Sequence, residues 1–339
     1  MFNIEKLLTT KKRRNFLIFL GTFVLELFVA LILPKTGRSA NFFNRSSPIP
    51  KPGDKTFTFY PVKLDRTGQS RRERNQNKYF EIDLGNNTKL DMVSIQRSNK
   101  FQMGSPQNES QRGGNEIQSD HPVNAFYMSR YPITQRQWQK VAKLPKVELE
   151  LNDKPSTFGE NDLQRAKLPV ETISWEEAKE FCNRLSQKFE GKYRLPTEVE
   201  WEYACRANTT TPFYFGQTII PEVANYDCHY SYDRKLPEKD EMEKYRGKTV
   251  PVELIQAPNN FGLEGMCGNV WEWCEDDYFY YYPDRFGAPV EKNPLYRVIR
   301  GGAWNSFPAS CRSAKRNYKP QKIKMNTIGF RVVVVFRSS

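Results

Sequence analysis

The chemistry open to this sequence is limited by its small number of metal-binding and acid–base side chains. Its 339 residues include six cysteines and two histidines, His121 and His229. Two histidines argue against a histidine-rich iron or zinc centre and against most histidine-based acid–base catalysis. No two cysteines form a Cys-x-x-Cys pair, so no zinc site is expected. The sequence also contains no Ser-His-Asp set, phosphate loop or dinucleotide-binding fingerprint, and we assign no catalytic residue.

The segment RGGAWNSFPASCRSAKRNYK, residues 300–319, combines a regular frame with unrelated side chains. The frame consists of a Gly-Gly pair, Trp304 and the phrase Cys-Arg-Ser-Ala that begins at Cys311. The positions between them share no chemical property; they are Ser306, Phe307, Ala309, Ser310, Lys315 and Tyr318. Such a segment is either a loop that does chemistry or a surface that binds a partner.

The composition predicts a folded domain that is rich in aromatic side chains. Hydrophobic residues make up 38% of the chain and charged residues 27%, which favours a folded domain. Aromatic residues, at 14%, can build the core of an irregular fold or furnish a contact surface. The net charge of +13 predicts long-range attraction to anionic surfaces. Because no nucleic-acid-binding motif is present, we do not expect a nucleic acid partner.

The first 34 residues predict a membrane anchor or a secretion signal. Residues 1–14 form a basic N-terminus, and the apolar run NFLIFLGTFVLELFVALILP, residues 15–34, is close to the length that spans a bilayer. The positive charge before this run predicts a cytoplasmic N-terminus and export of the rest of the chain. The alternative is a cleaved signal peptide, for which Arg38-Ser39-Ala40 is a poor cleavage site because an arginine stands where a small residue is needed. We therefore favour a single-pass anchor with an extracytoplasmic C-terminal domain, and a secreted domain is the alternative.

The rest of the chain divides into a linker and one α+β domain. Residues 35–88 are polar and broken, and we interpret them as a partly disordered tether in which FTFY and KYFEIDL could form short strands. In the domain, residues 89–337, capping boxes mark three helix starts, at Thr134, Ser174 and Thr197. The run FRVVVVF, residues 330–336, predicts a strand. We expect short helices around small antiparallel sheets, with much irregular structure.

Six phrases in residues 89–337 together resemble the formylglycine-generating enzyme family, whose domain is also called the sulfatase-modifying-factor domain. They are MVSIQRSNKFQMGS (92–105), FYMSRYPITQRQW (126–138), PVETISWEEAKEFCNRLS (169–186), YRLPTEVEWEYACRA (193–207), FGLEGMCGNVWEWCEDDY (261–278) and RGGAWN…CRSAKRN…IGFRVV (300–333). The resemblance implies a variant of the C-type lectin fold. It does not by itself imply an activity, because function depends on the site rather than on the fold.

The resemblance implies a copper-dependent oxidase only if two cysteines are present to bind the metal. Active members of the family oxidise a substrate cysteine to formylglycine with a copper ion held by two thiolates, five residues apart and shortly after a Gly-Gly-Ser. Cu(I) prefers thiolate ligands, and one thiolate alone would hold it weakly. Here Ala303 replaces that serine, Ser306 stands at the first cysteine position, and Cys311 could supply only the second thiolate. We therefore favour a protein without copper and without this activity.

The resemblance also implies a disulfide and two calcium sites. Cys205 and Cys311 resemble positions that are bridged in relatives, and export would allow the bond to form. Calcium takes several oxygen ligands from carboxylates, amides and backbone carbonyls. The implied ligands are Asn225, Tyr226, Glu243 and Tyr245 for the first site, and Gly268, Val270 and Glu272 for the second. At the second site Gly265 stands where relatives have an acidic or amide side chain.

The segment 300–319 resembles the variable region in targets of diversity-generating retroelements. In those proteins the frame reads RGGSWNNNP…CRSANRN…IGFRV and carries substitutable side chains on a lectin-type or formylglycine-enzyme-like domain. The resemblance implies a binding surface made of Trp304, Ser306, Phe307, Ser310, Lys315, Tyr318, Lys319 and Lys322. Ordinary drift in a loop is the alternative. Aromatic anchors with a basic rim would suit a protein, an anionic glycan or another anionic surface as the partner.

Three hypotheses about function follow from the sequence. The favoured one is a membrane-tethered, lectin-like binding domain displayed outside the cytoplasm. The second is a formylglycine-generating oxidase, or a related enzyme, with a modified metal centre. The third is a structural docking subunit of a membrane assembly.

Overall fold

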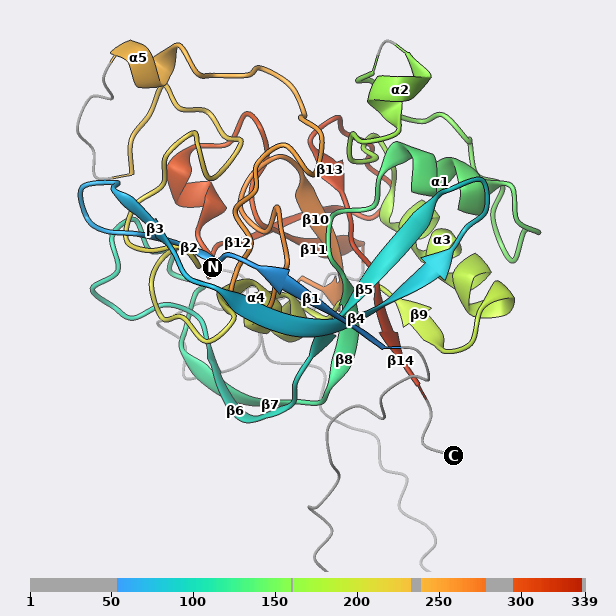
Figure 1. Ribbon diagram of the computed structural model, residues 1–339, viewed down its shortest axis with the longest axis horizontal. Helices are drawn as coiled ribbons and strands as arrows, with labels where there is room; N and C mark the ends of the chain where they lie inside the picture. The colour runs from blue at the N-terminus through green and yellow to red at the C-terminus, as the bar shows by residue number, and fades with distance from the viewer. Residues whose placement is uncertain (1–53, 160, 233–238, 279–294, 337–339) are drawn as a thin grey trace, which may run out of the picture. The chain divides into compact units, whose positions relative to one another are not determined.

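A computed structural model describes residues 54–159, 161–232, 239–278 and 295–336 of the chain (Figure 1). The predicted membrane segment, residues 15–34, lies outside these ranges. Within them, no helix combines the length and the apolar character that crossing a bilayer requires.

Six strands form the larger sheet, in the order β1-β4-β5-β8-β14-β9 (Figure 1). Their bounds are β1 Lys55–Phe59, β4 Asn75–Asp83, β5 Lys89–Ile95, β8 Phe126–Ser129, β14 Val333–Val335 and β9 Lys192–Arg194. All neighbouring strands in this order are antiparallel. Met128 of β8 pairs with both Val93 of β5 and Val333 of β14. The strand predicted near the C-terminus therefore lies inside the sheet, between β8 and β9.

The folded domain begins earlier than the sequence predicts. β1 pairs with β4 along its whole length, and β4 pairs with β5. Phe59, Phe80 and Ile82 are buried in the core. The predicted short strands FTFY and KYFEIDL thus correspond to β1 and β4, which belong to the sheet and not to a tether, so the folded domain begins before the predicted boundary at Lys89. The polar run around residues 70–78 made this part of the chain resemble a linker, because most of its side chains face solvent.

The smaller sheet carries the segment 300–319. Its order is β12-β11-β10-β13, and the bounds are β10 Trp271–Asp277, β11 Tyr296–Arg300, β12 Arg316–Pro320 and β13 Ile328–Gly329. β10 and β13 are parallel, whereas β11 is antiparallel to both β10 and β12. Two ribbons complete the strands: β2 Val62–Leu64 with β3 Ser70–Arg72, and β6 Ser98–Met103 with β7 Ser119–Val123. The fold is thus of the mixed α/β type. It differs from the predicted small antiparallel sheets, because one sheet has six strands and β10 pairs with β13 in parallel.

The three longer helices begin where their capping boxes predict. They are α1 Gln135–Ala142, α3 Trp175–Lys188 and α4 Glu198–Arg206. In each, the N-cap side chain accepts from the N3 backbone amide, and the N3 side chain accepts from the N-cap amide. The remaining helices are single turns: α2 Asp162–Arg165, α5 Lys239–Met242 and the 3₁₀ turn η1 Pro308–Cys311.

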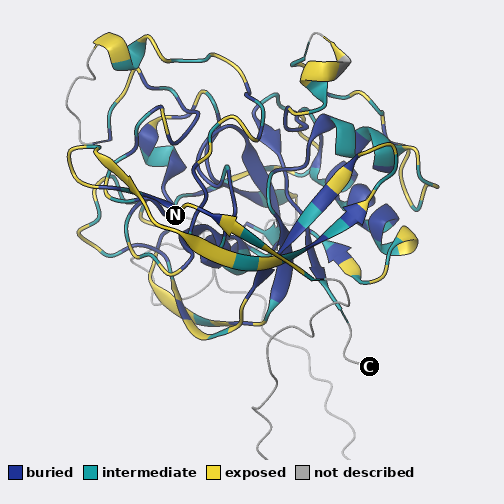
Figure 2. Cartoon of the chain, viewed as in Figure 1, coloured by how far each residue is buried: buried dark blue, intermediate teal, exposed yellow. Residues whose placement is uncertain are grey.

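The buried residues, dark blue in Figure 2, include two hydrophobic clusters. In one, Trp138 of α1 stacks on Phe181 of α3 with ring centroids 5.5 Å apart, and Phe330 meets both rings edge-on. The other cluster contains Trp201 of α4 and much of the loop that follows this helix. Because α4 also packs on β10 and β11, it helps to position the smaller sheet.

Candidate binding surface

Three buried arginines, Arg300, Arg312 and Arg316, anchor the segment 300–319 to the rest of the domain. Arg300 ends β11, Arg316 begins β12, and the two face each other in the strand register. Arg312 follows directly after η1. None of the three is more than 8% exposed, so each must be paired within the protein.

Arg312 is held by the loop between β6 and β7. It donates to Glu116 through two hydrogen bonds of 2.7 Å and to Glu109 through one of 2.6 Å. A fourth hydrogen bond, of 2.8 Å, reaches the carbonyl of Gln111. Both carboxylates are buried with it. The loop after η1 is therefore fixed to a segment almost two hundred residues away in the chain.

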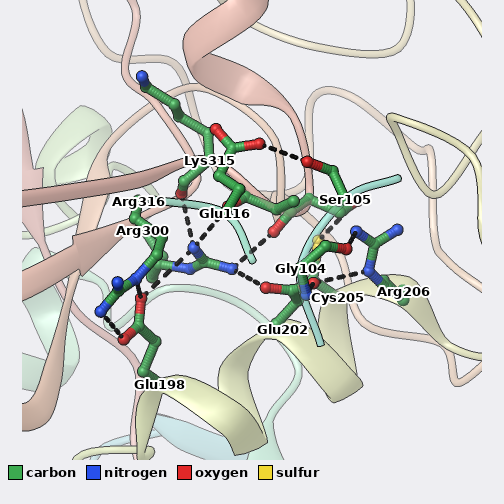
Figure 3. A network of polar contacts seen from close by, with 12 residues as sticks. Gly104, Ser105, Glu116, Glu198, Glu202, Cys205, Arg206, Arg300, Lys315 and Arg316 are labelled. Atoms are coloured by element: carbon green, nitrogen blue, oxygen red, sulfur yellow. Dashed lines mark hydrogen bonds and ion pairs between the residues drawn. The ribbon is translucent and has the colours of Figure 1, made fainter. Parts of the chain in front are cut away.

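Arg300 and Arg316 are held by two carboxylates of α4, Glu198 and Glu202 (Figure 3). Arg316 makes a bidentate pair with Glu198, with distances of 2.7 and 2.8 Å. Glu202 lies between Arg300 and Arg206, and Arg206 donates to it at 2.8 Å. Burial opposes the ionisation of Glu202, but Arg206 and Arg300 outweigh it and lower its pKa. The network fixes both strands of the segment to one helix.

The Gly-Gly pair of the frame is required by backbone conformation and by contact. Gly301 and Gly302 have φ angles of +97° and +78°, which side chains rarely permit. A Cβ atom on Gly302 would lie 2.5 Å from the sulfur of Cys311. The turn therefore brings the backbone against Cys311, and any other residue would push the two apart.

The structure places the predicted surface residues in three different environments. Phe307 and Lys322 are exposed, and Tyr318 is 37% exposed. Trp304, Ser310, Lys315 and Lys319 are half-buried. Ser306 is buried and does not belong to the surface, because its hydroxyl accepts a hydrogen bond from the Ala303 amide. The prediction that Ser306 contacts a ligand is therefore wrong.

Two aromatic residues that the sequence did not single out contact this surface: Tyr230 extends it, and the buried Tyr278 supports it from within. Tyr230 is 51% exposed, and its ring meets Phe307 edge-on with centroids 4.5 Å apart. Tyr278 stacks on Tyr318 at 4.1 Å. Tyr230 lies far from Phe307 in the chain, so no local spacing could have revealed the contact.

The residues at the implied copper position do not fit a copper ion. Ser306 offers a hydroxyl in place of a thiolate, and this hydroxyl is turned back onto the Ala303 amide at 2.9 Å. Cys311 is fully buried, and burial raises the pKa of its thiol. A thiol must lose its proton to bind a metal. We therefore derive no chemistry through copper.

The predicted disulfide between Cys205 and Cys311 is absent. All six cysteines are free thiols in the described part of the chain, and all are buried. Cys205 lies 3.6 Å from the Ser313 hydroxyl. Burial opposes ionisation of Cys205, but a hydrogen bond from the Cys267 thiol lowers its pKa. Cys205 is thus directed at Cys267 and Ser313, and the prediction of a bond to Cys311 is corrected.

The first implied calcium set is brought together only in part. Asn225 is buried, and its amide oxygen has no hydrogen-bond partner among the described residues, which suits a cation. Its amide nitrogen donates to Asn269 and to the carbonyl of Lys248. Tyr226 follows it in the chain. The carboxylate of Glu243 is 67% exposed beside Lys239, and Tyr245 lies in the turn after α5.

The second implied calcium set does not fit a calcium ion. Glu272 accepts from Arg331 at 2.7 and 2.8 Å and from Trp201 at 2.6 Å. An arginine thus already neutralises the only carboxylate of the set. Gly268 and Val270 would offer backbone carbonyls alone.

A cavity of about 410 Å³ lies beside α4 and is lined in part by Glu198, Asp276, Ser119 and His121. Burial and the nearby Glu198 raise the pKa of Asp276 to about 6, although the Glu198 amide donates to its carboxylate at 2.6 Å. The Ser119 hydroxyl lies 2.8 Å from His121 Nε2. In the described part of the chain no acid holds the other ring nitrogen, so these residues do not form a catalytic triad.

Comparisons with known proteins agree on one family. The model of the "Sulfatase-modifying factor enzyme 1-like domain" matches residues 82–335. The serine/threonine-protein kinase pkn1 of Chlamydia caviae is 30% identical over 244 residues, which are 65% of this chain and 35% of the kinase. The formylglycine-generating enzyme of Mus musculus is 30% identical over 177 residues, 50% of this chain and 45% of that enzyme. The match therefore spans less than half the length of each of these two relatives.

A third relative and two solved structures match over more of their length. The inactive C-alpha-formylglycine-generating enzyme 2 of Bos taurus is 25% identical over 262 residues, 66% of this chain and 79% of that protein. The structure of PvdO from Pseudomonas aeruginosa has a TM-score of 0.59 at 25% identity, covering 76% of this chain and 98% of PvdO. Variable protein 1 of Treponema denticola has a TM-score of 0.58 at 22% identity, with the same coverage, and shows a shared fold.

Proposed function

Because this chain belongs to the family of sulfatase-modifying factor enzyme 1-like domains, and because it lacks the pair of copper-binding thiols, we propose that it is a recognition domain of that family. Its binding surface is formed by the exposed and half-buried side chains of residues 304–322, which we call the recognition surface. The domain is held outside the cytoplasm by the N-terminal segment. Its partner is a protein, an anionic glycan or another anionic surface.

The observation that carries this proposal is the state of Ser306. At the place where active relatives have a metal-binding cysteine, the chain has a hydroxyl that closes a turn with the Ala303 amide. The family contains proteins without the enzymatic activity, as the name of the bovine relative states. A buried, hydrogen-bonded serine supports a place among such members, because it can neither bind soft copper nor reach a substrate.

The separation between a buried frame and exposed side chains within the segment also supports a role in recognition. The frame is buried and paired, whereas Phe307, Tyr318 and Lys322 reach the solvent from it. A rigid frame limits the conformational entropy that is lost on binding. Exposed aromatic side chains are the kind that dominate the energy of protein interfaces. The segment can therefore change its exposed side chains without changing its backbone.

Substitution of Phe307 by alanine is expected to weaken partner capture while leaving the free energy of unfolding within about 1 kcal/mol, because the ring is 54% exposed. Capture is measured by pull-down from detergent-solubilised membranes, with the captured partner quantified for each variant. The matched control is Leu254→Ala, since Leu254 is 57% exposed and lies outside the recognition surface. Equal capture by both variants would contradict the proposal. A loss of stability of several kcal/mol would show that Phe307 is a core residue.

Calcium at the first implied site is a second part of the proposal. The unpartnered amide oxygen of Asn225 supports it, and Glu243 would supply the charge. We expect removal of calcium with a chelator to lower the melting temperature by roughly 2–4 °C, the shift for about 1 kcal/mol in a domain of this size. Glu243→Gln is expected to abolish the response to calcium without changing the melting temperature of the calcium-free protein, because the carboxylate is mostly exposed. A wild-type protein with the same melting temperature in calcium and in chelator would refute this site.

A further inference from the structure

Lys315 carries an ammonium group that no acidic side chain in the described part of the chain pairs. The residue is half-buried, and its Nζ makes no hydrogen bond or ion pair there. Burial lowers the pKa of Lys315, Glu116 opposes this, and the charges of Arg312 and Arg300 lower it further. A partly buried cation without a counter-charge is unfavourable, and an anion beside it would relieve the cost.

Glu116, which acts on Lys315, and Glu198, which pairs with the next residue Arg316, are already committed to other donors. Glu116 accepts two hydrogen bonds from Arg312 at 2.7 Å, one from the Ser105 hydroxyl at 2.8 Å and one from the Gly113 amide at 3.0 Å. Both oxygens of Glu198 are taken by Arg316. Pairing Lys315 with either acid would compete with a buried ion pair, so neither of them supplies its counter-charge.

The backbone of Lys315 is fixed by hydrogen bonds to Arg312 and Arg300. Its amide donates to the carbonyl of Arg312 at 3.1 Å. Its carbonyl accepts from Arg300 at 2.8 Å, and that of Ala314 accepts from Arg300 at 3.0 Å. In Figure 3 the Lys315 side chain extends away from the pair formed by Glu198 and Arg316. The ammonium group is thus presented from a pre-organised position, which favours binding.

Two more lysines of the recognition surface lack counter-charges. Lys319 and Lys322 make no ion pair or side-chain hydrogen bond with any residue that the structure describes. Apart from Lys315, the charged side chains near them are Arg316 and Lys324, which are paired with Glu198 and Glu177. The others, such as Asn317 and Tyr318, are neutral hydrogen-bonding or aromatic groups. Separate cations among hydroxyl, amide and aromatic groups suit a hydroxylated ring that bears single charges. A nucleic acid would require a continuous basic track along its phosphates.

We propose that Lys315 is the anion-binding group of the recognition surface, and that its ligand is the carboxylate or sulfate of an acidic polysaccharide. This inference rests on the proposed function, since it names the chemical class that the recognition surface takes. The ammonium donates hydrogen bonds to the anion. The anion supplies the counter-charge that no described side chain provides. Lys319 and Lys322 attract the same polymer from the rim.

The test measures binding of the purified full-length chain to polygalacturonate and chondroitin sulfate, with neutral dextran as the reference polymer. We expect Lys315→Met to weaken binding to at least one acidic polymer by roughly tenfold or more, the loss of about one strong charge-assisted contact. Lys315→Arg keeps the charge and is expected to retain most of the affinity. The matched control is Lys192→Met, which removes an exposed lysine from β9. The melting temperature of Lys315→Met without ligand should not fall, because no partner within the protein is lost.

Several outcomes would overturn this inference. One is no binding of the wild-type chain to either acidic polymer, and another is an equal loss of affinity for Lys315→Met and Lys192→Met. Equal binding to single-stranded DNA or phosphatidylglycerol vesicles, insensitive to Lys315, would reveal non-specific attraction to the net positive charge. If Lys315→Met does not fold, Lys315→Gln and Lys315→Arg give the same comparison. The recognition role survives these failures, because it is tested separately by capture with Phe307→Ala.

Discussion

Replacing Arg312 with methionine is expected to lower the free energy of unfolding by about 3–5 kcal/mol. The substitution removes four hydrogen bonds and leaves the carboxylates of Glu109 and Glu116 buried without their cation. Removal of one partner from a buried ion pair is costly because the remaining charge keeps its desolvation penalty. Denaturation by urea, followed by tryptophan fluorescence, measures the loss.

The matched control for Arg312 is Lys63→Met, which removes one partner of an exposed ion pair. Lys63 lies 2.6 Å from Glu73, and the two side chains are 39% and 53% exposed. Exposed pairs contribute about 0–1 kcal/mol, so this variant should be close to the wild type. Similar losses in both variants would show that Arg312 is not an anchor. Faster hydrogen exchange of the amides of residues 306–319 in Arg312→Met would show directly that the recognition surface depends on it.

Local features of the sequence predicted the helices well. A capping box is a contact between residues three apart, so Thr134, Ser174 and Thr197 mark their helices without help from the rest of the fold. β1 and β4 were predicted only as short strands of the linker, FTFY and KYFEIDL, and not as part of the domain. Their place in the sheet depends on pairing with β5, and their charged outer side chains resemble those of a linker.

The candidate site shows the same limit. The sequence identified the exposed Phe307 and Tyr318 because the frame around them is regular. It misassigned Ser306, since nothing in the sequence shows that this hydroxyl bonds to the Ala303 amide. The partners of Arg312 also escaped notice, because Glu116 lies 196 residues away. From the sequence alone, an arginine in a polar loop is interpreted as a solvated charge, because its carboxylate partners lie far away in the chain.

The buried arginines explain why one segment can combine a constant frame with unrelated side chains. Arg300, Arg312 and Arg316 tie the segment to α4 and to the β6–β7 loop through charged hydrogen bonds. The energy that holds the backbone therefore comes from residues that never reach the ligand. A substitution at Phe307 or Lys322 leaves these bonds untouched. Stability and specificity are thus assigned to different positions within the same stretch of chain.

Replacing Glu272 with glutamine is expected to lower the free energy of unfolding by about 3–5 kcal/mol, although the two side chains have almost the same shape. Glu272 is 1% exposed and accepts three hydrogen bonds, two from Arg331 and one from Trp201. An amide offers only one acceptor atom, and it carries no charge to balance the fully buried Arg331.

The matched control is Glu264→Gln: burial raises the pKa of Glu264, and one of its oxygens has no hydrogen-bond partner among the described residues. This control should lose less than about 1.5 kcal/mol, because the ionised form gains less from its surroundings. Equal losses in urea denaturation would mean that burial alone sets the cost, and that the Arg331 pair does not hold β10 of the smaller sheet to the segment between β13 and β14.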